Sequence, residues 1–269
     1  MSRVVGGAPK QAGIFEPFST DNTMELDDMA PEVAQEFYPQ ALKMLHESGL
    51  PFLMGGGFAL RQYTGMQRAM KDMDVFCKAG DCPRLLKIFN DEGFKTELVD
   101  ARWLAKAYKE GKYVDFIFNN PGNNMPVNDG WFRRAPDGTE FGVPVKYISA
   151  EDLFRCKIYV QNRERYDGSD LNHLILRHGE HMDWERILQT LEQHWQLVLM
   201  QLLSFQFVYP SERDIIPRWL FDELLLRAKE QFDMPPPTEK VCRGLLIDQT
   251  QYAPAVTEWG FKAMTIMTI

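Results

Sequence analysis

The chain has 269 residues, 45% hydrophobic and 25% charged, a balance typical of a folded protein with one large or two modest cores. Its net charge of −8 argues against a dedicated nucleic-acid binder, because affinity for a phosphate backbone depends on clustered lysine and arginine. The four cysteines form no C-x-x-C pair, and the apolar runs are shorter than the ~20 residues that span a bilayer. We therefore expect a cytoplasmic protein with reduced thiols and no membrane contact.

The first part of the chain predicts alternating strands and helices. Residues 1–30 mix glycine, proline and acidic residues without periodicity, which predicts an N-terminal arm. From Pro31, apolar residues at helical spacing predict a helix that ends near Gly49, and a short buried strand follows at 51–54. After a glycine turn at 55–57, the sequence predicts a helix at 58–63, a strand at 73–77 and a helix at 84–90.

The middle of the chain predicts an antiparallel β-rich segment. Strands are expected at 95–99, 103–108 and 113–118. The connection Lys109–Lys112 is too short for a crossover, so the second and third of these strands should form a hairpin. Residues 119–142 hold three prolines among glycines and asparagines, which predicts a long loop or a loosely paired excursion.

From Ser149 onward the pattern is helical. Ser149 with acidic residues close behind it resembles a capping box and predicts a helix to about Asn162. Further helices are expected at 167–177, at 184–207 as one long amphipathic helix, and at 217–232. The prolines at 235–237 end the last of these, and aromatic residues beyond them predict a tail that packs back onto the body.

These elements predict an α+β fold that is divided along the chain. The expected parts are an N-terminal arm (1–30), an α/β domain with a small β-sheet and flanking helices (31–148), a helical domain (149–232) and a C-terminal tail (233–269).

Three aspartates are the strongest candidates for chemistry. Asp72 and Asp74 are two residues apart beside a strand, so both side chains should point to one face, where their like charges favour a bound cation. Carboxylate ligands select a hard metal, Mg²⁺ or Mn²⁺. Asp115 interrupts an apolar strand, where burying a carboxylate unpaired is costly. If the two strands are neighbours, the three carboxylates can hold two metal ions for phosphoryl transfer.

A glycine turn precedes the carboxylates. Glycines at 55–57 would let backbone amides approach phosphate oxygens, and the helix that follows adds partial positive charge. A nucleotide also needs cations, and Arg68 and Lys71 flank the aspartates.

Lys157 is a third cationic candidate. It falls on an inward-facing helical stripe, where it could bind triphosphate or be a lysine that snorkels to the surface. Asp167 and Asp170 could hold Lys157 or cap their own helix, and capping is the favoured interpretation.

Three segments together resemble the DNA polymerase beta-type nucleotidyltransferase superfamily, and the match is closest to its small bacterial antibiotic-modifying and toxin–antitoxin enzymes. They are Gly56-Gly57-Phe58-Ala59-Leu60, Arg68-Ala69-Met70-Lys71-Asp72-Met73-Asp74-Val75-Phe76 and Val114-Asp115-Phe116-Ile117, within a resemblance that covers about 51–174. It implies a mixed sheet with flanking helices, a helical second domain, and transfer of a nucleoside monophosphate from an NTP such as ATP, with release of pyrophosphate.

The resemblance also implies roles for single residues. Asp72 and Asp74 would bind both metal ions, Asp115 would complete the site and help activate the acceptor, and Gly56 and Gly57 would face the triphosphate. Met70 departs from the family pattern, which often has Thr or Ser at this position.

Two other functions remain open at this stage. One is a nucleotide-binding sensor that keeps the fold without turnover, which Met70 would suit, and the other is a metal-dependent glycosyltransferase that uses a D-x-D pair on a sugar nucleotide. The glycine turn and the third aspartate favour nucleotidyl transfer. The acceptor can be a small molecule, a protein or tRNA, and the toxin–antitoxin likeness leaves an antitoxin partner open.

Overall fold

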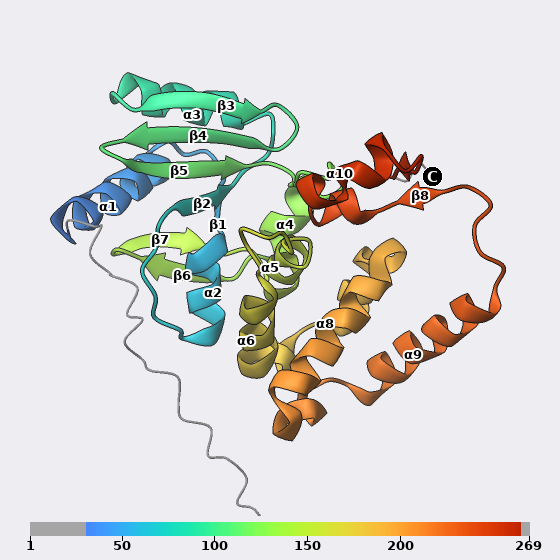
Figure 1. Ribbon diagram of the computed structural model, residues 1–269. Coiled ribbons are helices and arrows are strands. Elements are labelled where there is room, and N and C mark those ends of the chain that lie inside the picture. The colour runs from blue at the N-terminus through green and yellow to red at the C-terminus, as the bar shows by residue number, and fades with distance from the viewer. Residues whose placement is uncertain (1–30, 265–269) are drawn as a thin grey trace, which may run out of the picture.

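The computed structural model describes residues 31–264, with side chains from residue 36 onward. As predicted, the fold is α+β: a five-stranded mixed sheet with flanking helices precedes a mostly helical region (Figure 1). The elements that build the sheet and its immediate cover are α1 (Pro31–Glu47), β1 (Leu53–Met54), α2 (Gly56–Thr64), β2 (Met73–Phe76), α3 (Cys82–Asp91), β3 (Lys95–Asp100), β4 (Leu104–Lys109) and β5 (Lys112–Ile117).

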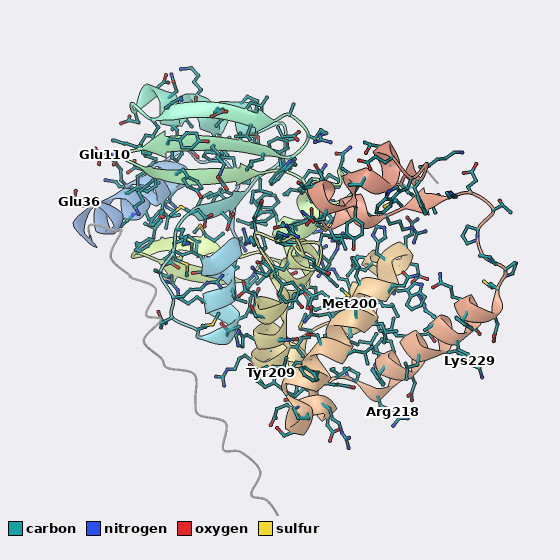
Figure 2. The ribbon with its side chains drawn as sticks, in the orientation of Figure 1. Glu36, Glu110, Met200, Tyr209, Arg218 and Lys229 are labelled. Carbon is teal, nitrogen blue, oxygen red and sulfur yellow. The ribbon has the colours of Figure 1, made fainter. Side chains whose placement is uncertain are left out.

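The sheet has the strand order β1-β2-β5-β4-β3. Strands β2 and β5 are parallel, and the other neighbours are antiparallel, which includes the predicted β4–β5 hairpin. Its turn contains Glu110, labelled in Figure 2, with φ of +53°, and Gly111 with φ of +75°. Two left-handed residues make the tight turn that suits the twist of a hairpin. The resulting register sets Asp115 beside Asp74 on one side and Lys106 on the other.

Part of the core lies between one face of the sheet and α3. Val75 and Phe116 are fully buried there, and the ring of Phe116 packs edge-on against Phe89 of α3 at 5.2 Å between centroids. Because side chains alternate along a strand, the residues next to Val75 and Phe116 point to the opposite face. Asp74 and Asp115 occupy those positions, so burial of the apolar face orients both carboxylates.

The prediction of a long loop or a loosely paired excursion at 119–142 is correct only in part, since residues 119–128 form neither helix nor strand. The structure has a short helix after them, α4 (Asp129–Arg134), followed by a hairpin of β6 (Asp137–Glu140) and β7 (Val143–Lys146). The Asn128 side chain accepts a hydrogen bond of 2.8 Å from the Gly130 backbone N–H and so caps the helix. Trp131 is buried and stacks on Phe76 at 5.6 Å, which anchors the segment to the sheet.

The helical region begins where predicted but is more divided. It contains α5 (Ala150–Lys157), α6 (Gly168–His178), α7 (Trp184–Thr190), α8 (Trp195–Val208) and α9 (Arg218–Asp233). The Ser149 cap is confirmed, since its Oγ accepts a hydrogen bond of 3.2 Å from the Asp152 N–H. The helix ends at Lys157 instead of reaching Asn162, because the chain turns and the Val160 N–H donates to the Lys157 carbonyl at 2.9 Å.

The single long helix predicted at 184–207 was also wrong. Helices α7 and α8 are separated by a 3₁₀ turn at Glu192–His194, and His194 leaves helical geometry with φ of −128°. The His194 ring nitrogen Nδ1 lies 2.6 Å from Tyr159 Oη, which fastens this break to the segment after α5. The apolar spacing continues through the break, so periodicity alone could not reveal it.

The chain after α9 returns to the sheet side of the molecule (Figure 1). It forms β8 (Val241–Cys242), α10 (Gln249–Thr257) and β9 (Lys262–Ala263), and β8 pairs with β9. Leu246 and Ile247 pack against the main core. The division into domains stays a prediction. Among residues 31–264, no helix is both long and apolar enough to cross a membrane.

Candidate active site

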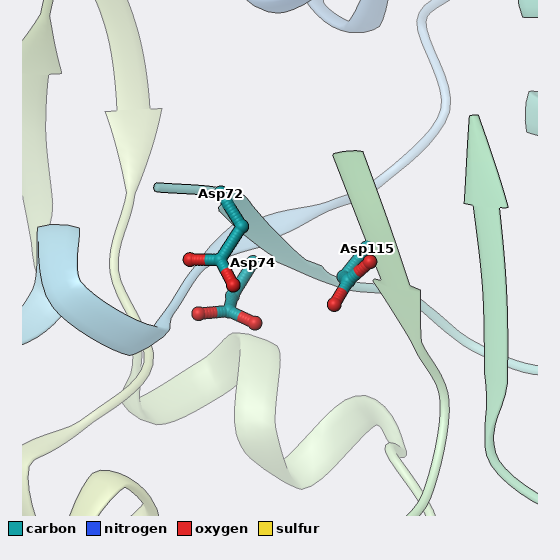
Figure 3. Close-up of side chains that lie close together, drawn as sticks. All are labelled: Asp72, Asp74 and Asp115. Carbon is teal, nitrogen blue, oxygen red and sulfur yellow. The ribbon is translucent and has the colours of Figure 1, made fainter. Parts of the chain in front are cut away.

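Asp72, Asp74 and Asp115 lie close together at the neighbouring strands β2 and β5 (Figure 3). Asp72 immediately precedes β2, Asp74 lies within it, and Asp115 is its direct neighbour on β5. One carboxylate oxygen from each residue lies within 4.8 Å of the other two. The prediction that the three carboxylates come together on neighbouring strands is therefore confirmed. Their roles stay predictions.

Gly56 lies directly against this cluster. It has φ of +50°, a conformation that favours glycine, and a Cβ atom added here would lie 1.6 Å from Asp74 Oδ2. The preceding Gly55 N–H donates to the Asp74 carbonyl at 2.9 Å, so the glycine turn and β2 are joined by backbone. Gly57, the other predicted phosphate-facing glycine, has Met70 Sδ 2.7 Å from the position of a Cβ atom. A side chain on Gly56 would therefore collide with Asp74, and one on Gly57 would displace Met70.

Lys106 on β4 pairs with Asp115. Its Nζ lies 2.7 Å from Oδ1 and donates a hydrogen bond of 3.0 Å to Oδ2, and it also lies 4.0 Å from the centre of the Tyr113 ring. Oδ1 is buried and accepts no well-aligned hydrogen bond from the described residues. Burial raises the pKa of Asp115, and the bond and charge of Lys106 oppose that shift.

Asp74 has a strongly raised pKa. Burial raises its pKa to about 7, and the negative charges of Asp72 and Asp115 contribute to the rise, while Arg165 and Lys157 oppose it. Three carboxylates this close are costly to keep ionised without a cation. The donor set consists of oxygen atoms only and includes a buried oxygen without a hydrogen bond. These residues therefore fit a hard divalent cation such as Mg²⁺ or Mn²⁺.

Lys157 is fully enclosed beside the carboxylates. Its Nζ donates hydrogen bonds of 2.8 Å to Asp167 and 2.6 Å to Asp170, and its side chain is 4% exposed. The favoured interpretation that these aspartates cap their helix was wrong, because Asp167 occupies the N-cap position of α6 but makes no side-chain capping bond. An ammonium group buried without a partner is costly, and the two carboxylates offset that cost. Contact of Lys157 with a triphosphate stays a prediction.

Two arginines extend this network to the surface. Arg68 makes a two-pronged pair with Asp170 at 2.8 and 3.0 Å, and Arg165 makes one with Asp167 at 2.9 and 3.1 Å. With Lys157, three cations face two carboxylates, which leaves one net positive charge beside the aspartate cluster. This arrangement suits a bound polyanion.

A cavity of about 430 Å³ connects these charges. Three residues of its wall were predicted to contact phosphate: Gly57, Arg68 and Lys71. Asp72 and Asp74 of the carboxylate cluster and Arg165 also line it. Lys157 instead lines a smaller cavity of about 190 Å³ with Asp74 and Asp115. The two cavities share Asp74 and Arg165, and Asp170 joins Arg68 of the first to Lys157 of the second.

Two residues of the site were not identified from the sequence. Lys106 could have been found from the hairpin register. A two-residue turn at Glu110 and Gly111 makes Lys109 the partner of Lys112, and three residues farther along each strand Lys106 is opposite Asp115. Arg165 lies in a compact turn in which its N–H donates to Asn162 Oδ1 at 2.7 Å. No periodic pattern marks such a turn, and its position over the carboxylates depends on tertiary structure.

The model of one protein family matches residues 34–196, more than half of the chain. The family is described as "Nucleotidyl transferase of unknown function (DUF2204)". The chain belongs to this family. It is a nucleotidyltransferase, which confirms the superfamily resemblance seen in the sequence. A search of curated proteins found no match to the chain.

Solved structures with a similar arrangement include lincosamide antibiotic adenylyltransferase LnuA, with 18% identity and a TM-score of 0.39 over 52% of this chain and 94% of that one. The antibiotic-resistance factor ANT(2'')-Ia has 17% identity and a TM-score of 0.42 over 67% and 95%. JHP933 from Helicobacter pylori has 11% identity and a TM-score of 0.39 over 74% and 97%. Similarity at this level concerns the fold alone.

Proposed function

We propose that this nucleotidyltransferase transfers a nucleoside monophosphate from an NTP, ATP in the first instance, to the hydroxyl group of an acceptor, with release of pyrophosphate. The observation that carries the proposal is the cluster of Asp72, Asp74 and Asp115, whose oxygens lie within 4.8 Å of one another beside Gly56. A cluster of this kind is suited to a divalent cation that also binds substrate phosphates.

The three aspartates would hold Mg²⁺ or Mn²⁺, and two ions are expected for this chemistry. When bound, the ions would neutralise charge on the reacting phosphoryl group and on the leaving pyrophosphate. The absence of a side chain on Gly56 leaves room for the Asp74 carboxylate itself. This donor set and the family membership favour nucleotidyl transfer over the D-x-D glycosyltransferase alternative.

The cations of the chain would position the triphosphate. Arg68, Lys71 and Arg165 line the cavity of about 430 Å³ with Asp72 and Asp74. An NTP bound here would exchange part of the contact between each arginine and its aspartate partner for contacts with phosphate oxygens. Guanidinium groups are suited to such two-pronged contacts.

Asp115 would take the proton of the acceptor hydroxyl. The hydroxyl oxygen forms a bond to the α-phosphorus, the bond from that phosphorus to the β-phosphate oxygen breaks, and pyrophosphate leaves with the electron pair. Burial makes Asp115 a stronger base than an exposed aspartate, because its pKa is raised. Lys106 would hold the carboxylate in place through its contacts with both oxygens.

The deciding experiment gives the purified protein α-phosphate-labelled ATP, Mg²⁺ and a cell extract, and follows label into small molecules, protein and RNA. We expect transfer by the wild type and none by Asp72→Ala or Asp74→Ala, with thermal unfolding showing both variants folded. Asp91→Ala, on the exposed outer surface of α3, is the matched control and should keep full activity. Transfer retained in both site variants would overturn the proposal.

The sensor alternative predicts a different combination of results. Calorimetry with Mg²⁺ and each NTP would then give binding, while a pyrophosphate assay with the same extract would detect no turnover. The same titrations identify the preferred base.

A further inference from the structure

A second cavity, of about 440 Å³, lies next to the carboxylate cluster at the end of the sheet where β5 terminates. Its wall comes from three parts of the chain that are distant in sequence: the β3–β4 connection, the segment after α5 and the C-terminal tail. The residues that matter here are Trp103, Tyr159, Val160, Leu246, Ile247 and Asp248. The tail residues lie beyond residue 196, where the family match ends.

This tail cavity adjoins the aspartates. It shares Trp103, Pro121 and Val160 with the cavity of about 190 Å³ that contains Asp74 and Asp115. The Trp103 carbonyl accepts a hydrogen bond of 3.0 Å from the N–H of Phe118, three residues beyond Asp115. Three residues of extended strand span about 10 Å, so a molecule of ordinary metabolite length in the tail cavity can reach the carboxylates.

The cavity of about 430 Å³ meets the cluster from the side of Asp72 and Asp74, and the route to the tail cavity meets it from the side of Asp115, while Glu164 lines both the cavity of about 430 Å³ and the tail cavity. Arg68 and Lys71 line the cavity of about 430 Å³, whereas Trp103 and Asp115 line the cavity of about 190 Å³ that leads to the tail cavity. Asp74 borders both sides. In phosphoryl transfer the attacking and leaving oxygens are roughly in line, so donor and acceptor must approach the reacting phosphorus from opposite sides. A triphosphate beside Arg68 leaves the tail cavity as the side for the acceptor.

The tail wall is fixed in place by specific contacts. Asp248 is buried; its Oδ1 accepts a hydrogen bond of 2.8 Å from the Gln251 N–H and its Oδ2 one of 3.3 Å from the Arg163 N–H. Leu246 comes so close to Gly122 that its Cδ2 would lie 3.0 Å from a Cβ atom there. These contacts join the tail to the segment that carries Arg165, and they make the cavity part of the folded structure.

The lining indicates the chemistry of the ligand. Trp103, Leu246 and Ile247 offer apolar surface, and an indole face packs well against a flat ring. The wall carries one net negative charge, that of Asp248, whose oxygens accept hydrogen bonds from two backbone N–H groups. Asp100 is neutralised by Arg102 through bonds of 2.6 to 3.2 Å. Arg163 and Glu164 add one charge of each sign. A wall of this kind favours a neutral ligand over a polyanion.

We propose that the tail cavity is the acceptor site and that the acceptor is a neutral small molecule with a ring and a free hydroxyl group. This inference rests on the proposed function, because it assigns the second substrate of the same site. The volume lies within the range of about 300–1,000 Å³ that is usual for small-molecule sites. RNA is disfavoured, since its phosphates would meet Glu164 and the pair of Asp100 with Arg102 instead of clustered cations.

The test measures binding separately from turnover. The probe is phenyl β-D-glucopyranoside, a neutral compound with an aromatic ring and free hydroxyls, observed by saturation-transfer NMR on the full chain without NTP. We expect saturation of the probe by the wild type and at least a tenfold weaker affinity for Leu246→Arg, which places a charge in the cavity. Leu226→Arg, on the exposed side of α9, is the matched control and should bind like the wild type.

Two further variants make the outcome decisive. Asp72→Asn should bind the probe normally, so a failure of nucleotidyl transfer and a failure of acceptor binding are distinguishable. If Leu246→Arg does not fold, Trp103→Ala takes its place, with the same loss expected. Absence of probe binding to the wild type, or equal binding by the wild type and the cavity variants, overturns the inference.

The nucleic-acid alternative is tested with the trinucleotide cytidylyl-cytidylyl-adenosine. Binding of this probe that is lost in Leu246→Arg would overturn the assignment of a neutral small molecule. Once label from ATP has been found in a product of the extract, Leu246→Arg should raise the KM for that acceptor at least tenfold and leave the KM for ATP unchanged.

Discussion

The Asp74 carboxylate packs so close to the backbone of Gly56 that only glycine fits at this position. A Cβ atom there would lie 1.6 Å from Asp74 Oδ2. We predict that Gly56→Ala displaces the Asp74 carboxylate and reduces nucleotidyl transfer at least a hundredfold. The measurement is the rate of transfer from labelled ATP at saturating Mg²⁺.

Gly65 supplies the control for backbone strain. It ends α2 with φ of +72°, close to the φ of +50° at Gly56, and has no atom within 4 Å of a Cβ position. Both alanine variants should lose about 1–2 kcal/mol of stability from the left-handed conformation. Only Gly56→Ala should lose activity, and equal activity in the two variants would contradict the role assigned to this contact.

Lys157 offers a second prediction, on stability. Replacing it by methionine leaves Asp167 and Asp170 buried without their shared ammonium, and breaking a buried ion pair costs about 3–5 kcal/mol. Urea unfolding of Lys157→Met should give a loss of this order. Lys87→Met, which breaks an exposed pair with Asp91, should lose less than about 1 kcal/mol.

The same variant tests the phosphate contact predicted for Lys157. If the ammonium also binds the triphosphate, folded Lys157→Met should bind ATP more weakly than the wild type at equal Mg²⁺. Unchanged ATP affinity, together with the loss of stability, would leave Lys157 with a structural role only.

Much of the site could be predicted from the sequence because it depends on local rules. Strand alternation orients Asp74, and the apolar residues around Asp115 place that residue on a sheet strand. The short connection at Glu110 fixes the hairpin. These signals act over a few residues, and local patterns capture them.

The features that were missed depend on contacts between distant segments. Asp167 has the position of a helix cap, but its Oδ2 accepts a hydrogen bond from the buried Lys157, ten residues earlier. The break before Trp195 is fastened by Tyr159, which lies far away in sequence. The tail cavity forms because Leu246 packs close to Gly122, in the segment that follows β5. Neither periodicity nor capping preference contains this information.

The raised pKa of Asp74 gives a third prediction, on pH. A carboxyl whose pKa is about 7 in the folded state, above the ordinary value of 3.8, binds its proton more tightly when folded. Its stabilising contribution is fully present below about pH 4 and is lost as the pH rises to about 7. Asp74→Asn mimics the neutral form and should therefore raise the stability of the metal-free protein more at about pH 8 than at about pH 5.

Thermal unfolding in the presence of EDTA measures this difference at each pH. Saturating Mg²⁺ should stabilise the wild type at the higher pH and have a smaller effect on Asp74→Asn, which has lost a charged ligand. An Asn variant that is less stable than the wild type at both pH values, by the same amount, would show that the three carboxylates do not repel one another in the folded protein.

The last prediction concerns Asp152, which joins three helices away from the aspartate cluster. It is fully buried and accepts hydrogen bonds from Arg134 of α4 at 3.2 Å, Arg155 of α5 at 3.3 Å and Arg186 of α7 at 2.5 Å. Removing the carboxylate leaves cationic groups close together without their shared partner, so Asp152→Ala should lose about 3–5 kcal/mol in urea unfolding. Asp222→Ala, which breaks an exposed pair with Arg218 on α9, should lose less than about 0.5 kcal/mol.

At temperatures where Asp152→Ala is folded, its transfer rate should stay close to that of the wild type. Asp152 binds arginines that hold the helices together and does not belong to the cluster of Asp72, Asp74 and Asp115.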